Sequence, residues 1–400
     1  MEKKMNNLIK NEIKATPSLP EGSVAGVAPA ERRGLGQSPI QIETQLRLTN
    51  GVRKVSFRYD LLNKNDIKIG ELDGITRAHI SYGEFRPIKR SATFEINEHQ
   101  QQEINYLSDQ IQPWFVLHMP CGNTAQWPLG IFLLESPTKQ TTGNVSTRHI
   151  GAYDKTIIVE QDKFLNSFFI EKGTNYVTAV TRILNTAGIT KINITQTSHS
   201  LPSDREYRLG TKKHLTINEL LREINYTTLW FDEFGVARSE PYITPARREI
   251  TQIYDTTKNS IITPTFTEHL NIADRPNVFI RVALNLENNQ ELTSTFINDD
   301  ITSPISTVNR GRQIPNYETI DNITNQEMLD AFVRRVAVES TSAYTHLTFG
   351  TALMPTQPST LLCIFPEIFS TPQKFHLTGW EMPLVYDGIM THHARKVVRF

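Results

Sequence analysis

Adjacent histidines at His392 and His393 are the residues in this 400-residue sequence whose chemistry most directly suggests a metal site. Imidazole nitrogens are common zinc ligands. The flanking residues, however, predict a β-strand, in which successive side chains point to opposite faces of the sheet. Two neighbouring histidines on a strand cannot bind one ion without a bulge, so we interpret both as exposed or packed strand residues. We expect this chain to bind no metal and no cofactor.

Neighbouring carboxylates, the groups that an acid–base mechanism would use, occur at Asp232 with Glu233 and at Asp299 with Asp300. Both pairs lie in segments whose composition predicts turns. Aspartate favours turns because its side chain accepts hydrogen bonds from nearby backbone N–H groups. We interpret both pairs as turn residues. Asp154, which follows an apolar run, is likewise interpreted as a turn or cap residue rather than as an acid or a base.

The sequence has two cysteines, Cys121 and Cys363, which lie far apart and are both flanked by apolar residues. Free cysteine is among the most buried residue types, so we predict two buried thiols. Two thiols cannot build a four-thiolate zinc or iron–sulfur site, and they give no disulfide framework. This cysteine content fits synthesis in a cytoplasm.

Sequence motifs of common enzyme classes are missing: the chain has no HExxH, CxxC, GxSxG or P-loop sequence. Arginine pairs begin at Arg32, Arg247 and Arg334, but they are scattered and lack interleaved aromatic residues, so a nucleic-acid groove is not indicated. The 42 basic and 42 acidic residues leave no net charge to attract nucleic acid or an anionic membrane. We predict no catalytic residues, and hence no enzyme.

No apolar run approaches the length of a transmembrane helix, and the N-terminal residues lack the apolar region of a signal peptide. We therefore expect no membrane anchor and no classical export.

The hydrophobic pattern divides the chain into four parts. Its first part is rich in Pro, Gly, Ala and Ser, which is typical of an arm or linker. Strand patterns follow, with turn signals at Asn50-Gly51, at Asp73-Gly74 and at residues 120–123. The predicted parts are an N-terminal arm or linker at 1–44, a first β-barrel domain at 45–165, a small α/β domain at 166–245, and a second β-barrel domain with one inserted helix at 246–400.

The small α/β domain is predicted to hold two helices and a β-hairpin. Thr174 is the expected N-cap of the first helix and Gly188 its C-terminal stop. Thr216 and Glu219 have the spacing of a capping box at the start of the second helix. Residues 232–235 are the expected hairpin turn. The predicted fold class is α+β and β-rich, with two β-barrel-like domains and the small domain between them.

Residues 127–164 connect the first β domain to the small domain. An apolar run ends here in Ser136-Pro137, and we expect this proline to stop the strand because it has no N–H to donate. The segment is therefore interpreted as scaffold.

Four stretches in a fixed order carry a resemblance to a known family. They are WPLGIFLLESPTKQ, HIGAYDKTIIVEQDKF, FIEKGTNYVTAVTRILNTAGI and LTINELLREINYTTLWFDEFGVARSEPY. Taken in this order they resemble the baseplate hub, or tail-tip hub, proteins of tailed bacteriophages and of related contractile injection systems. The resemblance covers residues 45–242, and it rests on the order of the motifs.

The resemblance implies a structural virion protein that forms a homotrimer. Two similar β-barrels in each chain would give a pseudo-sixfold ring. One side of the ring would meet the tail tube or a distal tail protein, and the other side the threefold central spike or fibre. The tape-measure protein, and later DNA in transit, would pass through its lumen. The sequence itself shows no internal repeat.

Two other functions remain open as alternatives: a tail-associated cell-wall hydrolase and a carbohydrate-binding tail module. A hydrolase needs a polar triad or an acid pair in a cleft. A sugar-binding module needs exposed aromatic residues, whereas most aromatic residues of this sequence fall inside apolar runs such as FFIE, LWF and CIF.

Overall fold

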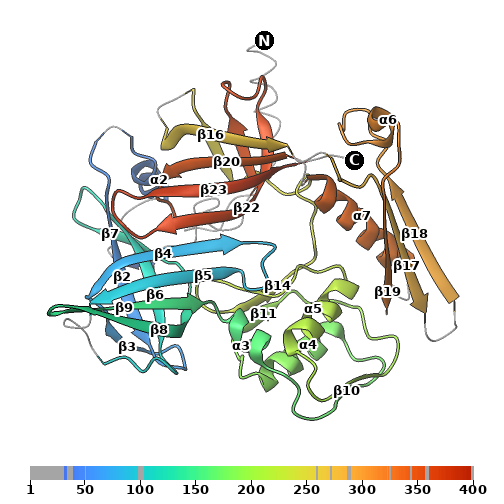
Figure 1. Ribbon diagram of the computed structural model, residues 1–400, viewed down its shortest axis with the longest axis horizontal. Helices are drawn as coiled ribbons and strands as arrows, with labels where there is room; N and C mark the ends of the chain where they lie inside the picture. Colours follow the sequence, from blue (N-terminus) through green and yellow to red (C-terminus); the bar gives the residue numbers. More distant parts are fainter. Residues whose placement is uncertain are drawn as a thin grey trace.

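A computed structural model shows a large β-sheet, a small domain with helices beside it, and a third part in which one helix lies against three strands (Figure 1). No helix in the described part of the chain is long and apolar enough to cross a bilayer. The structure describes residues 31–33, 39–49, 51–97, 103–257, 260–270, 273–285, 290–321, 323, 326–342, 345–355 and 360–397.

Short strands joined by tight turns make up the first β region, as the pattern predicts. Along β5, alternate residues Ala92, Phe94 and Ile96 are buried, which is the period of a strand with one face on the core. The hairpin predicted at residues 120–123 is confirmed, because Met119 N donates to Asn123 O at 2.8 Å. The strands of this region are β1 (Glu31–Arg33), β2 (Lys54–Leu62), β3 (Lys68–Glu71), β4 (Ile75–Gly83), β5 (Arg90–Asn97), β6 (Gln110–His118), β7 (Thr124–Pro128), β8 (Phe132–Thr142) and β9 (Val145–Tyr153).

The last β region has the same character, and its buried residues belong to the same core cluster as those of the first region. Phe349, Phe375 and Trp380 are among its largest buried side chains. Its strands are β15 (Gln252–Asp255), β16 (Ile262–Leu270), β20 (Thr345–Ala352), β21 (Thr360–Ile364), β22 (Gln373–Pro383) and β23 (Ile389–Lys396).

All of these strands pair into one large, mainly antiparallel sheet, so the predicted β-rich α+β fold is confirmed. The two regions join where β22 pairs with β4, with Gly379 opposite Gly83 and Pro383 opposite His79. The pairings of the described strands close no barrel. The expectation of two separate barrels is therefore corrected to a single open sheet, because an edge of the first region pairs with the last region.

A repeat that the sequence did not show is visible in the strand order. The first region contributes the order β8-β9-β5-β4 and the last region the order β22-β23-β20-β16. We number the four strands of each group from one to four in the order in which they occur along the chain. In both groups the order of the strands across the sheet is then third, fourth, second, first. Every neighbouring pair in both groups is antiparallel. The chain therefore contains the same four-strand unit twice.

The small domain packs α4 and α5 around a core of its own, as predicted. The predicted stop at Gly188 is confirmed by its positive φ of 79°. The N-cap of α4 is Asn175 rather than Thr174, because the Asn175 side chain accepts the N–H groups of the first turn. Its elements are α3 (Thr156–Gln161), β10 (Phe168–Ile170), α4 (Tyr176–Thr186), β11 (Ile192–Ile194), β12 (Arg205–Tyr207), α5 (Lys213–Glu223), β13 (Trp230–Phe231) and β14 (Ala237–Ser239).

The capping box predicted for α5 is wrong. The helix begins three residues before Thr216, and Thr216 Oγ1 donates to Lys212 O inside the first turn instead of capping it. Apolar packing of Ile217, Leu220 and Leu221 fixes the position of the helix regardless of the cap.

The helix predicted within the last region comes with a sheet of its own. α7 covers one face of three strands, and Phe279, Leu329 and Val333 lie in their common core. This inserted unit leaves the large sheet after β16 and returns at β20, where Leu270 lies opposite Thr345. Its elements are β17 (Val278–Asn285), β18 (Gln290–Ile297), α6 (Thr307–Arg310), β19 (Pro315–Asp321) and α7 (Gln326–Ser342).

Three turn or strand-end predictions in the first region are wrong. β2 pairs with β3 and β6, so no hairpin is formed at Gly51, and Asn50 lies outside the described residues. β3 and β4 flank Asp73-Gly74 but do not pair with each other. β8 continues past Ser136-Pro137, because a bulge between Glu135 and Thr138 accommodates the proline.

The predicted arm at residues 1–44 also needs correction. Residues 1–30 lie outside the described part of the chain, but β1 pairs with β7, and helix α2 (Pro39–Leu46) follows. Ile42 and Leu46 lie one helical turn apart and pack into the core of the large sheet. The other predicted domain boundaries stay predictions.

Replacing Gly379 by alanine should destabilise the junction of the two β regions. A Cβ at this position would lie 2.9 Å from the carbonyl oxygen of Tyr82, which belongs to the backbone of β4 and cannot move aside. We expect the free energy of unfolding, measured in urea, to fall by about 1–3 kcal/mol. Gly151→Ala is the matched control, because a Cβ there meets its nearest atom at 3.9 Å. Equal effects of the two substitutions would contradict this account.

Candidate interdomain cavity

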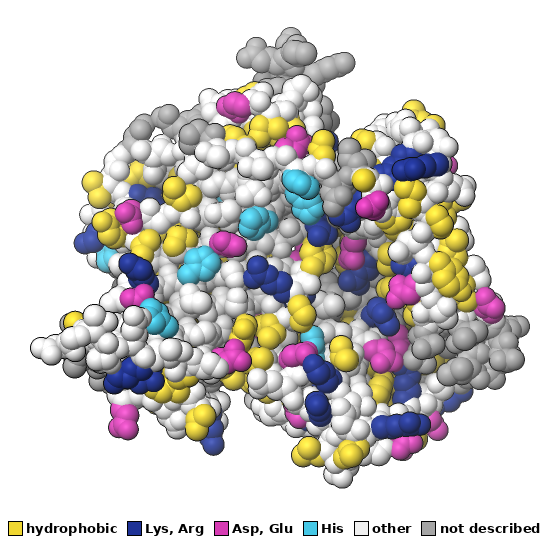
Figure 2. Space-filling view, in the orientation of Figure 1, with side chains coloured by type: hydrophobic (Ala, Val, Ile, Leu, Met, Phe, Trp, Pro, Cys, Tyr) yellow, Lys and Arg dark blue, Asp and Glu magenta, His cyan; other side chains and the backbone are white. Residues whose placement is uncertain are grey.

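A cavity of about 1070 Å³ lies where the large sheet, the small domain and α7 meet. Acidic and basic side chains are both gathered around this junction (Figure 2). Its walls come from the β4–β5 turn, α5, the segments on either side of β14, and α7. The charged lining residues are Glu84, Arg86, Lys89, Glu160, Asp232, Glu233, Arg238, Glu240, Arg248, Arg335 and Glu339.

Glu84 connects the two β regions across this cavity. Its Oε2 lies 2.6 Å from Nε2 of His376 in β22, and Nη1 of Arg248 lies 3.5 Å from the same imidazole. Burial raises the pKa of Glu84, but the charges of His376, Arg248 and Lys89 together lower it by more than burial raises it. The pKa of Glu84 therefore lies below its usual value. The carboxylate is therefore held in its charged form.

His214 is the residue of the cavity whose surroundings most resemble an acid–base site. Its Nδ1 lies 2.6 Å from Oε2 of Glu160, and its Nε2 lies 2.8 Å from the amide nitrogen of Asn218. Burial lowers the pKa of His214 although Glu160 opposes the shift. A neutral ring that donates from Nδ1 and accepts at Nε2 satisfies both contacts. Nε2 is thus bound to an amide rather than to a hydroxyl or a thiol, and the arrangement positions α5 on α3.

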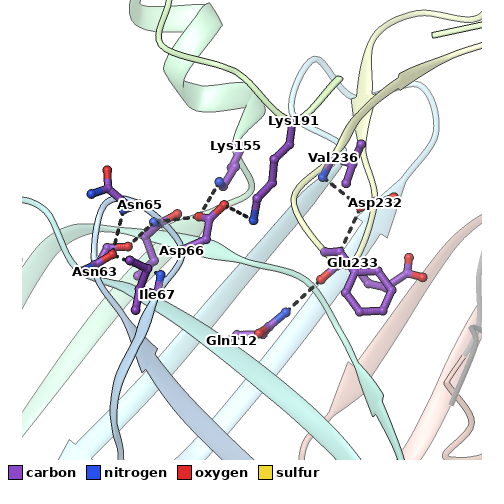
Figure 3. A network of polar contacts seen from close by, with 12 residues as sticks. Asn63, Asn65, Asp66, Ile67, Gln112, Lys155, Lys191, Asp232, Glu233 and Val236 are labelled. Atoms are coloured by element: carbon purple, nitrogen blue, oxygen red, sulfur yellow. Dashed lines mark hydrogen bonds and ion pairs between the residues drawn. The ribbon is translucent and has the colours of Figure 1, made fainter. Parts of the chain in front are cut away.

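Asp66 fastens the first β region to the small domain (Figure 3). It lies in the β2–β3 turn with a positive φ of 61°. Its Oδ1 is 2.5 Å from Nζ of Lys155, and its Oδ2 is 2.8 Å from Nζ of Lys191. Burial raises the pKa of Asp66, but the two ammonium groups lower it by more. These ion pairs hold α3 and the segment before β11 against the sheet.

The hairpin turn of the small domain makes a second contact with the sheet (Figure 3). Oδ1 of Asp232 accepts the N–H groups of Phe234 and Val236, so the predicted turn is confirmed. The carbonyl oxygen of Glu233 accepts a hydrogen bond of 3.2 Å from Nε2 of Gln112 in β6. Oδ2 of Asp232 accepts a hydrogen bond of 2.8 Å from Nε of Arg238, so both residues position the turn.

The interpretation of Asp154 as a turn or cap residue, rather than as an acid or a base, is confirmed. Its Oδ1 accepts the N–H of Thr156 at the start of α3, and its Oδ2 accepts the N–H of Arg90, both at 2.9 Å. Burial raises the pKa of this carboxyl group. Asp300 also acts as a turn residue, since its Oδ1 accepts the N–H of Thr302 at 2.8 Å.

His392 and His393 lie on opposite faces of β23, as expected for a strand. His392 is buried, its ring stacks on Phe349 at 5.0 Å, and its Nε2 lies 2.8 Å from Oγ1 of Thr351. Burial lowers the pKa of His392 to about 3, so the ring is neutral. Nδ1 of His393 lies 3.2 Å from Oγ1 of Thr348. Within the described ranges, no group of three or more metal-binding side chains is placed to hold an ion.

The two cysteines differ from each other. Cys363 is buried in β21, and burial raises the pKa of its thiol. Cys121 is exposed, so the prediction of a buried thiol is wrong there. Met119, just after β6, packs into the core, whereas Cys121 lies in the turn between β6 and β7, where Gly122 has a positive φ of 87°.

The structure brings together residues that are far apart in the sequence. Arg247 and Arg334, which the sequence pattern presents as scattered, line one second cavity of about 690 Å³. Glu84 and His376 are also brought into contact by the β4–β22 pairing. No local sequence signal marks these pairs, because each depends on how distant strands and helices pack.

Known structures with a similar fold include tail proteins. The tail protein of Neisseria meningitidis MC58 aligns with a TM-score of 0.62 at 12% sequence identity, over 85% of this chain and 96% of that chain. This chain has the fold of a phage tail protein. The 43 kDa tail protein of prophage MuSo2 from Shewanella oneidensis gives a TM-score of 0.58 at 12% identity, over 86% of this chain and 98% of that chain.

A further similar structure comes from a Francisella complex, PdpA–VgrG in its lidless form. One chain of it aligns with a TM-score of 0.52 at 8% identity, over 89% of this chain and 67% of that chain. No protein-family model matches the sequence, and no curated protein matches it. The similarity to tail proteins is therefore one of fold.

Glu84→Gln should make the stability of this tail-protein fold less dependent on acid pH. The folded-state pKa of Glu84 lies below its usual value of 4.5, so its ion pair stabilises the native state above that pH and is lost as the pH falls through the folded-state pKa. At pH 7 the substitution should lower the free energy of unfolding by about 1–2 kcal/mol. The free energy of unfolding is measured in urea at a series of pH values between about 6 and 3. Over this range the variant should lose less stability than the wild type. Parallel curves for the two proteins would refute the role of Glu84.

Proposed function

We propose that this protein is a structural hub of a phage tail, located at the tail tip or baseplate, where it joins the sixfold tail tube to a threefold central spike or fibre. The observation that carries this proposal is the repeated four-strand unit, in a fold similar to that of tail proteins. A chain with two equivalent units presents six of them when three copies form a ring. Such a ring matches a sixfold partner on one side and a threefold partner on the other.

The edges of the large sheet support a ring of this kind. Within one chain, β4 ends the first unit and pairs with β22, which begins the second unit. β16 ends the second unit, and it pairs only with β20 among the described strands. β8 begins the first unit, and its pairing with β6 is limited to Leu133 and Phe132. In the proposed trimer, β16 of one copy lies along β8 of the next and covers both edges.

The register of that contact follows from the equivalence of the two units. Thr138 lies opposite His149, as Gly379 lies opposite His393. Pro383, four residues beyond Gly379, pairs with His79. Thr142 in β8 is equivalent to Pro383, because it lies four residues beyond Thr138. His269 in β16 is equivalent to His79, since His269 lies opposite His346 of β20 as His79 lies opposite Thr93 of β5. The proposal therefore places Thr142 of one copy opposite His269 of its neighbour.

The two four-strand units, joined by the pairing of β4 with β22, form one layer of eight strands. The face of this eight-strand layer that points away from the core is the proposed lining of the channel. Each strand turns alternate side chains to this face, and most of them are polar. The residues of this face named below include two acidic and two basic side chains, so they form no basic surface on which DNA phosphates would bind. Such a lining suits passage of the tape-measure protein and of DNA. Residues assigned to this face include Arg77, His79, Thr93, Glu95, His149, Thr267, His269, His346, Thr348, Glu381, Thr391, His393 and Arg395.

The alternatives, a cell-wall hydrolase and a carbohydrate-binding tail module, have less support. Asp154 and Asp232, candidates for acid–base work, are engaged by backbone N–H groups. Of the aromatic runs, Phe231 and Phe365 are buried, whereas Phe169 of FFIE is 49% exposed.

Light scattering should give a mass of three chains for the purified protein, or for the protein within isolated tail tips if assembly requires its neighbours. Threefold density at the tail tip would be the corresponding result from electron microscopy. A monomer in both settings, or density on the outside of the tail, would rule the hub out.

Cross-linking tests the proposed contact directly. Thr142→Cys combined with His269→Cys, in a Cys121→Ser background that removes the exposed thiol, should give covalent trimers with a short bifunctional maleimide. Each single cysteine variant is the matched control and should give no trimer. A trimer by light scattering that fails to cross-link in the double variant would reject this register while leaving the oligomer intact.

A further inference from the structure

A groove between α7 and the segment that follows β14 forms the cavity of about 690 Å³. Asp330, Arg334 and Val338 are spaced four residues apart along α7, so they form one stripe of the helix facing the groove. Arg247 comes from the opposite wall. Two walls of different secondary structure therefore bring guanidinium groups into one groove.

The lining is basic on balance, since Arg247, Arg334 and Arg335 outnumber the single acidic lining residue, Asp330. Arg247 and Arg334 are exposed, and neither side chain has a hydrogen-bond or ion-pair partner within the part of the chain that the structure describes. Arg335 also lines the groove, but it is held in place: its Nε lies 3.0 Å from Glu339, and its guanidinium carbon lies 4.2 Å from the ring centroid of Tyr242. Two guanidinium groups thus remain available to an incoming anion.

A buried amide and an apolar wall complete the groove. Oδ1 of Asn225 is buried and has no hydrogen-bond partner, and Asn225 itself has a positive φ of 54°. A buried polar atom of this kind normally has a partner, and an N–H of a bound chain would supply one. Ile243 is 52% exposed beside it, and Phe296 and Val338 also contribute apolar surface.

We propose that this groove binds an acidic peptide segment of a partner protein. Carboxylates of the segment pair with Arg247 and Arg334, an N–H of its backbone bonds to Asn225, and an apolar side chain lies against Ile243. Guanidinium groups bind carboxylates through two parallel hydrogen bonds, which gives both affinity and orientation. A nucleic-acid backbone fits less well, because its phosphates offer no counterpart to the apolar wall. This inference goes beyond the hub function and does not require the trimer.

The test uses the full-length protein and a fluorescently labelled, blocked peptide of sequence Leu-Glu-Glu-Leu-Glu, with binding followed by anisotropy. The wild type should bind the peptide, and the double variant R247E/R334E should bind it at least tenfold more weakly. The matched control is R208E/R312E, which reverses two exposed arginines outside the groove and should bind like the wild type. R247Q/R334Q should also weaken binding, and unchanged thermal unfolding would show that both groove variants are folded.

Charge reversal gives an independent readout. A peptide with lysine in place of each glutamate should bind R247E/R334E in preference to the wild type. The proposal is overturned if the wild type does not bind the acidic peptide at millimolar concentration, or if R247E/R334E binds it as well as the wild type does. It is also overturned if inorganic phosphate or a DNA duplex competes with the peptide at equal or lower concentration, because the groove would then select an anion and not a peptide.

Discussion

The pairing of β22 with β4 is the contact on which the rest of the architecture depends. β22 begins the second repeat by pairing with β23, and over its last residues it also pairs with β4, so one strand joins the second repeat to the first. Gly379 allows the two backbones to approach, because a Cβ there would lie 2.9 Å from the carbonyl oxygen of Tyr82, and the Tyr82 ring stacks on Trp380 at 5.9 Å. Because buried backbone groups must be paired, this junction turns two repeats into one continuous layer.

The other parts are attached by side chains rather than by strands. Asp66 binds Lys155 and Lys191 of the small domain, and Arg335 of α7 donates to the carbonyl oxygen of Tyr226 at 2.7 Å. Partly buried ion pairs add little net stability, since desolvation offsets much of the attraction, but removing one partner is costly. Contacts of this type are suited to fixing the orientation of one domain on another.

Local signals were readable in the sequence, and non-local ones were not. The turn at Asp232, the stop at Gly188 and the cap at Asp154 were predicted because each depends on residues a few positions away. Cys121 was predicted to be buried because its neighbours are apolar, but the turn itself is exposed. The β4–β22 junction and the groove between Arg247 and Arg334 join distant segments, and no pattern in either segment specifies its partner.

The placement of the extra domains gives the eight-strand layer two unlike ends. The small domain begins after β9, and the inserted unit leaves β16 and returns at β20 at the same end of the layer (Figure 1). The opposite end carries the short β8–β9 and β22–β23 turns and the connections from β5 to β6 and from β20 to β21, and neither added domain leaves the layer there. In the proposed hub, the plain end repeats six times around the ring and suits a sixfold tube. The end with the added domains differs between the two repeats, so it repeats only three times and suits a threefold partner. One duplicated unit with unequal additions is therefore sufficient to convert sixfold into threefold symmetry.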